Sequence, residues 1–200
     1  MGFDLSDFKE IVISLAAAVT AYSAYRGVAT WKHELHGKAH FETARNLIRS
    51  TYKLRDEILI CRSPLISANE FPENYSPLSN DNTCNSKGDA YLFVYKNRWE
   101  PVSVAVQQFQ TNSLEAEVLL NKSIKGQTDK LLEAVKKLNL AIDAIIRNEY
   151  SSNRDFADLG FAQKTRATAY ATSIDDDELT KDINNAINSI ETSVKNYLPQ

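Results

Sequence analysis

The chain has 200 residues, with 23 basic and 26 acidic side chains and a formal net charge of -3, so it lacks the basic surplus on which general nucleic-acid binding depends. Six glycines and five prolines are few for the turns of an all-β fold, and the long runs rich in Leu, Ala, Lys, Glu, Asn and Ile predict an all-α protein. Cys61 and Cys84 form no CxxC pair and are too few for a disulfide scaffold, so both are expected to be reduced, reactive thiols.

The first predicted element is an apolar segment, residues 11–25, which reads IVISLAAAVTAYSAY and contains no charge. Extending it to Trp31 adds only Arg26 and gives about the 20 residues that a membrane-spanning helix needs. Tyr22, Tyr25 and Trp31 lie where an interfacial aromatic belt is expected. The segment is therefore predicted to be a transmembrane helix, with a buried alanine-rich helix of a soluble bundle as the alternative.

The residues around this segment predict its orientation and its assembly. Lysine and arginine are more frequent after the segment than before it, which places the following residues on the cytoplasmic side. Small residues recur at every fourth position, as in Ala16, Thr20 and Ala24, and this spacing favours self-association of membrane helices. Residues 1–31 are thus predicted to be a membrane anchor, and residues 32–200 a cytoplasmic domain.

Four amphipathic helices are predicted after the anchor, because apolar residues recur at alternating steps of four and three. Their approximate ranges are 31–61, 89–121, 128–150 and 176–197. Short and medium connections between such helices favour an antiparallel four-helix bundle, whose first helix continues directly from the anchor. The predicted seam residues include His40, Ala44, Leu47, Thr51, Leu54 and Ile58 in the first helix, Leu131, Val135, Leu138, Ile142 and Ile145 in the third, and Leu179, Ile183, Ile187, Ile190 and Val194 in the fourth.

Two stretches interrupt this pattern. Residues 63–88 contain three prolines and a polar run, which predicts a long loop that is either functional or mobile. Residues 151–175 are ambiguous, with one short helix expected near Phe161. Pro101 lies inside the second helix and is expected to kink or restart it, since proline removes a backbone donor.

All three histidines of the chain, His33, His36 and His40, fall on one face of the first helix. Three imidazoles close to Glu34 or Glu42 have the chemistry of a zinc, nickel or copper site, and they also titrate close to physiological pH. Because the same face continues into the apolar seam, the favoured interpretation is a packed, partly hydrated helix contact without a metal.

Arg55 is predicted to point close to the apolar seam, where a charge must be paired. An inter-helix ion pair is the favoured interpretation, and a ligand-binding arginine is the alternative. Arg98 and Trp99, beside Pro101, present the same two possibilities. The predicted partners of Arg55 are Glu115, Glu117 and Glu133.

The sequence carries no signature of catalysis. The phosphate-binding patterns GxxxxGK[ST] and GxGxxG are absent, and HELHG places its second histidine one residue too early for a HExxH zinc motif. No arginine is followed four to six residues later by a histidine, as in the ribonuclease motif of HEPN domains. No enzyme activity, cofactor or metal is therefore predicted.

The stretch from Trp31 to Glu70 contains the runs FETARNL, YKLRDEI, RSPLIS and EFP. These resemble a group of small bacterial membrane proteins of unassigned function, which have one N-terminal membrane helix and a helical cytoplasmic domain. The resemblance implies a bacterial inner-membrane protein. The layout alone is also similar to the membrane accessory protein of type VI CRISPR systems, an oligomeric, pore-like protein with a HEPN-like domain. The matching residues are Trp31, Lys32, Leu35, Gly37, Phe41, Glu42, Ala44, Leu47, Tyr52, Arg55, Asp56, Arg62, Pro64 and Glu70.

Three functional hypotheses follow. The first is a membrane-anchored interaction protein that forms a homo-oligomer and presents its bundle to a cytosolic protein partner. The second is an oligomeric, pore-like effector of a bacterial defence system, and the third is an enzyme with a site near Arg55 and the proline-rich loop. The candidate interaction residues are Trp31, His33, His36, His40, Arg55, Arg98 and Trp99.

Overall fold

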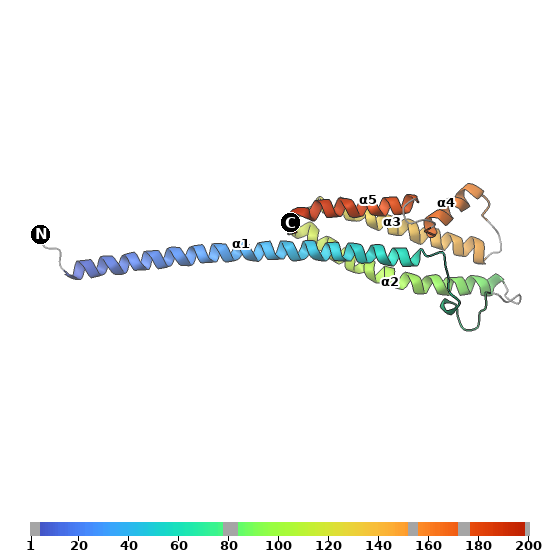
Figure 1. Cartoon of the computed structure of the whole chain (residues 1–200), viewed down its shortest axis with the longest axis horizontal. Helices are drawn as coiled ribbons and strands as arrows, with labels where there is room; N and C mark the ends of the chain where they lie inside the picture. The colour runs from blue at the N-terminus through green and yellow to red at the C-terminus, as the bar shows by residue number, and fades with distance from the viewer. Residues whose placement is uncertain (1–4, 78–83, 152–155, 172–176, 199–200) are drawn as a thin grey trace. The chain divides into compact units, whose positions relative to one another are not determined.

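All regular secondary structure in the described residues is helical, as the sequence predicts (Figure 1). The computed structural model describes residues 5–77, 84–151, 156–171 and 177–198. The chain divides into two compact units, Met1–Glu42 and Thr43–Gln200. Helix α1 (Leu5–Cys61) is continuous and contributes residues to both.

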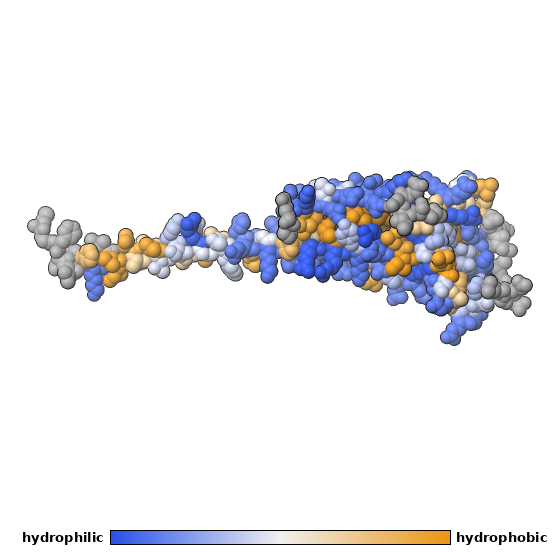
Figure 2. All heavy atoms as spheres, in the orientation of Figure 1, coloured by the Kyte–Doolittle hydropathy of each residue, from blue (hydrophilic) through white to orange (hydrophobic). Residues whose placement is uncertain are grey.

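The first unit consists of the N-terminal part of α1. From residue 12 to residue 39 every side chain is exposed, which includes the whole second half of the predicted anchor. The helix forms here because alanine and leucine are strong helix formers and because no proline interrupts the run. Hydrophobic residues gather in the N-terminal part of this stretch and hydrophilic residues follow them, while the visible face of the second unit is mostly hydrophilic with hydrophobic areas between (Figure 2).

The second unit is an antiparallel helical bundle. Residues 43–61 of α1 run in one direction, α2 (Cys84–Leu119) returns, α3 (Ile124–Ile145) follows the direction of α1, and α5 (Glu178–Val194) returns again (Figure 1). Helix α3 packs against α5, α2 and the short helix α4 (Leu159–Ala169). The up-down-up-down order is the predicted four-helix topology, with α4 as an additional element.

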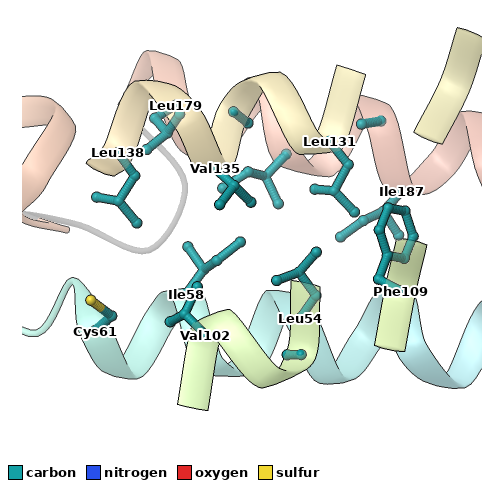
Figure 3. Packing of buried hydrophobic residues seen from close by; sticks show 14 of the residues in the cluster. Leu54, Ile58, Cys61, Val102, Phe109, Leu131, Val135, Leu138, Leu179 and Ile187 are labelled. Carbon is teal, nitrogen blue, oxygen red and sulfur yellow. The ribbon is translucent and has the colours of Figure 1, made fainter. Parts of the chain in front are cut away.

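The predicted seams form the core of this bundle. Leu47 and Leu54 of α1 are fully buried, and so are Leu131 and Leu138 of α3. These side chains meet residues of α2 and α5 in one hydrophobic cluster (Figure 3). His40 is only half-buried, so the seam of α1 begins effectively at Ala44.

Pro101 does not restart α2, which continues through it as one helix. The Pro101 ring lies on an exposed side of the helix. Val102, the next residue, and Ala105, one turn further on, are buried in the core. Packing of these neighbours therefore holds the helix together across the backbone donor that proline lacks.

The connections contain more helix than the sequence indicates. In the predicted loop of residues 63–88, a single 3-10 turn, η1 (Ala68–Glu70), precedes Phe71, which is buried, and α2 already begins at Cys84. Residues 78–83 lie outside the described residues. Helix α3 passes directly into a π-helical turn, η2 (Ile146–Ser151), and α5 ends in the 3-10 turn η3 (Lys195–Tyr197). The short helix expected near Phe161 is α4, whose first amides are capped by Asp158.

Candidate functional site

The exposed apolar stretch of α1 is the most unusual surface of the molecule. One 18-residue window has a mean hydropathy of 1.4 and none of it is buried, so this helix is long and apolar enough to span a membrane. Its side chains project in all directions, as shown by exposed fractions of 68% for Leu15, 59% for Val19 and 75% for Tyr25. An exposed apolar surface of this extent marks a site that lipid or protein covers.

The three histidines lie at the end of this stretch. His33 and His36 are exposed, and the ring centroids of His36 and His40 are 6.5 Å apart. Within the described residues, no three His, Cys, Asp or Glu side chains are grouped closely enough to hold a metal ion.

Arg55 does not form the predicted inter-helix ion pair. Its guanidinium donates to the neighbouring Asp56 at 2.7 Å and lies over the ring of Tyr52, 4.6 Å from the centroid. The Arg55 side chain is 35% exposed and already forms an ion pair with Asp56. It therefore requires no ion pair with Glu115, Glu117 or Glu133. The polar contact between α1 and α5 is made instead by the Tyr52 hydroxyl, which donates to Glu191.

Arg98, on α2, holds the first part of the proline-rich loop, residues 63–70, in place. It donates to the carbonyl oxygens of Ser63 at 2.7 Å and Leu65 at 2.6 Å, and its Nε lies 2.6 Å from Glu70 Oε2. The Arg98 side chain is 9% exposed and the Glu70 side chain 30%, so the ion pair is partly buried. Trp99 is half-buried against the main core. Of the two predicted possibilities for Arg98, the structure supports the ion pair.

The Arg98–Glu70 ion pair, called the clamp below, predicts that the stability of the loop at residues 63–71 depends on pH. The hydrogen bond from Arg98 lowers the pKa of Glu70, against the effect of burial, so the clamp stabilises the loop above the ordinary value near 4.5. The stabilisation is lost as pH falls through the lower pKa of the folded state. We expect the protection factors of the amide groups in residues 63–71, which are corrected for the intrinsic pH dependence of exchange, to fall below about pH 4.5. Glu70→Gln should show the lower protection already at pH 7, and unchanged protection in that variant would contradict the prediction.

Arg62 is the arginine that sequence reasoning missed. It is completely buried at the end of α1 and donates to the carbonyl oxygens of Ala167 and Thr168, each at 3.0 Å, near the C-terminus of α4. It also forms an ion pair of 2.9 Å with Asp177, the N-cap of α5.

The carboxyl group of Asp177 shares this network with Thr180. The Thr180 hydroxyl accepts from Arg62 at 2.8 Å and donates to Asp177 at 2.7 Å. Burial opposes ionisation of Asp177, but hydrogen bonds from Thr180 and Arg62 outweigh it and hold the pKa below its ordinary value. The only hint in the sequence was the position of Arg62 between a predicted helix and Pro64, which does not reveal partners more than 100 residues away.

A chain of tyrosines lies between α2, η2 and α4. The hydroxyl of Tyr170 is 3.0 Å from that of Tyr95 and 3.1 Å from that of Tyr150. The ring of Tyr150 stacks on Tyr91 with centroids 3.6 Å apart. Burial raises the pKa of all four phenols, so they stay protonated. Tyr95, Tyr150 and Tyr170 are joined by hydrogen bonds, and Tyr91 contributes its stacked ring.

Cys61 is enclosed beside these groups and is not the accessible thiol predicted from the sequence. It is 1% exposed, and burial raises its pKa from 9.0 to about 11, against the lowering effect of Arg98 and Arg62. The side chain of Cys84 lies outside the described residues.

The raised pKa predicts that the Cys61 thiol reacts slowly with alkylating reagents. Since the thiolate is the reactive form, the shift reduces its population near pH 8 by about a hundredfold. In a Cys84→Ser background, alkylation of Cys61 by iodoacetamide should therefore be at least about a hundredfold slower in the folded chain than in urea. Similar rates in the two conditions would show that the thiol is accessible.

A groove of about 350 Å³ runs between α3, α4 and α5. Leu140, Phe161 and Leu179 form part of its apolar lining. Two ion pairs border it: Lys137 Nζ lies 2.8 Å from Asp182 Oδ2, and Lys164 Nζ lies 3.9 Å from Glu178 Oε2. An apolar base with a charged border has the character of a protein contact surface.

Comparison with family models, with curated proteins and with solved structures found no match to this chain. The function is therefore inferred from the exposed stretch of α1 and from the surfaces of the bundle.

Proposed function

We propose that the protein is a single-pass, membrane-anchored interaction protein of a bacterial inner membrane, which self-associates and presents its helical bundle in the cytoplasm to a protein partner. The observation that carries this proposal is the complete exposure of the 18-residue apolar window of α1. In water, such a surface costs about 25 cal/mol for each Å² of apolar area, and a bilayer removes that cost.

Charge supports the proposed orientation. Between the apolar stretch and the bundle lie Arg26, Lys32 and Lys38, whereas Lys9 is the one basic residue before the stretch. An excess of lysine and arginine marks the cytoplasmic side of a membrane helix. The groove between α3, α4 and α5 is the surface that we assign to the cytosolic partner, because it combines an apolar base with charged side chains.

Removing residues 1–30 should transfer the protein from the membrane to the soluble fraction. The full chain is expected in the pellet after high-speed centrifugation and in the supernatant only after detergent is added. The truncated chain retains all of the buried core and should remain in the supernatant without detergent. Recovery of the full chain in the detergent-free supernatant would contradict the proposal.

One double variant, with one control variant, tests the same proposal without a truncation. Leu15→Lys combined with Val19→Lys places two charges in the apolar stretch, at a cost of about 2.5–3.5 kcal/mol each near the centre of a bilayer. This variant should shift to the soluble fraction. Leu114→Lys, on an exposed side of α2, is the matched control and should stay with the membrane. Depolarisation of cells on overexpression would instead favour the oligomeric pore.

A further inference from the structure

Residues 26–36 of α1 carry a basic face, of which the proposed orientation uses only the charges of Arg26 and Lys32. At about 100° per residue, Arg26, Lys32, His33 and His36 fall within an arc of roughly 120°. Val28, Trp31 and Leu35 occupy a narrower arc on the other side of the helix, with exposed fractions of 52%, 62% and 54%. The helix is therefore amphipathic directly after its apolar stretch.

The basic face is open to its surroundings. Every side chain from residue 21 to residue 39 is exposed, so within the described residues no other element packs against the two imidazoles. Arg26 lies over the ring of Tyr22, 5.8 Å from the centroid, at the end of the apolar stretch. The other charged groups nearby are on α1 itself, namely Glu34 and Lys38.

The balance of charge on this segment is positive. From residue 26 to residue 40 it contains three basic residues, Arg26, Lys32 and Lys38, and one acidic residue, Glu34, which gives 3 - 1 = +2 with neutral histidines.

We infer that the basic face, Arg26, Lys32, His33 and His36, is a binding site for the phosphate groups of anionic phospholipids. This inference rests on the proposed function, because α1 continues without a break from its inserted apolar stretch and so places the residues that follow at and just beyond the headgroups of one leaflet. Arginine and lysine donate charge-assisted hydrogen bonds to phosphate oxygens, and anionic lipid attracts basic residues beside a membrane helix.

Energy transfer from tryptophan to labelled lipid tests this site in the full chain. The chain has two tryptophans, so Trp99→Phe leaves Trp31 as the single donor and keeps an aromatic ring at the half-buried position. The protein is reconstituted in vesicles of phosphatidylcholine and phosphatidylglycerol, with a trace of dansyl label on one lipid or the other. We expect transfer to labelled phosphatidylglycerol to exceed transfer to labelled phosphatidylcholine by about twofold at pH 7.5. The preference should shrink in 0.5 M NaCl, because salt screens exposed charges.

Matched variants assign the preference to the basic face. Changing Arg26, Lys32, His33 and His36 together to glutamine should make transfer to the two lipids equal. Arg26→Gln with Lys32→Gln should remove most of the preference, because these two residues carry the fixed positive charge of the basic face. A control set of four exposed bundle lysines changed to glutamine should retain the preference; its members are Lys122, Lys125, Lys130 and Lys136.

The outcomes separate this inference from the proposed anchor. Equal transfer to both lipids by the parent chain, while it floats with the vesicles, would overturn the lipid site and leave the anchor standing. A chain that does not float would overturn the anchor itself. Loss of the preference in inorganic phosphate at constant ionic strength would reassign the site to free phosphate. Native mass spectrometry of the unsubstituted chain from the mixed lipid provides a second readout, in which retained phosphatidylglycerol should exceed phosphatidylcholine.

Discussion

Arg62→Met is expected to lower the free energy of unfolding of the bundle by about 3–5 kcal/mol, the usual cost of removing one partner of a buried ion pair. Methionine fills a similar volume and has no donor, so the carboxylate of Asp177 and the carbonyl oxygens of Ala167 and Thr168 lose the hydrogen bonds that Arg62 donates, and Asp177 keeps only those from Thr180. An uncompensated charge and unsatisfied acceptors then remain in the core.

The measurement is urea unfolding of the full chain in detergent, followed by circular dichroism at 222 nm. Arg55→Met is the matched control, because Arg55 is partly exposed and pairs only with the adjacent Asp56, and it should cost no more than about 1 kcal/mol. Equal midpoints for Arg62→Met and the parent chain would show that the buried network contributes little to stability. Arg62→Lys keeps the charge but offers a single nitrogen, so its loss should be intermediate.

Phe109→Ala is expected to cost about 3–5 kcal/mol, because it opens a cavity in the middle of the bundle. Phe109 is fully buried in the main cluster, where it lies close to Ile187 (Figure 3). Leu114→Ala on the same helix is the control, since that side chain is 63% exposed and should change stability by less than about 0.5 kcal/mol. If both variants unfold at the midpoint of the parent chain, the core assigned to α2 is wrong.

The bundle could be predicted because its core follows one simple rule. Leu131, Leu138 and Ile145 repeat at steps that keep them on one side of a helix, and burial of that side is what stabilises the fold. The end of α1 at Cys61 was also predictable, because proline at position 64 disfavours helical geometry in the residue before it.

Polar contacts between distant residues could not be predicted in the same way. Arg62 donates hydrogen bonds to backbone carbonyl groups near the end of α4. Every residue has a backbone carbonyl group, so the sequence does not mark which of them will accept. Arg55 was assigned to a distant glutamate, although the adjacent Asp56 satisfies it. Charge alone shows that an arginine needs a partner, whereas the packing of helices decides which partner is within reach.

The start of α2 and the environment of Cys61 show the same limit. The polar run before α2 indicated a loop up to residue 88, yet helix already begins at Cys84 and Ala90 is buried against Phe71. Cys61 was expected to be reactive because it ends a helix, but folding encloses it. Neither result follows from local composition, since both depend on which segments fold back onto the end of the bundle.

The π-helical turn η2 changes the helical spacing at the end of α3. Such a turn corresponds to one residue inserted into an α-helix, which rotates everything after it by about 100°. Here the rotation brings Tyr150 onto the ring of Tyr91. Deleting Asn148 would restore the ordinary spacing of α3, turn Tyr150 away from α2, and convert a tight junction between two helices into a gap. Homologous chains that are one residue shorter at this point should therefore also lack one of the two stacked tyrosines.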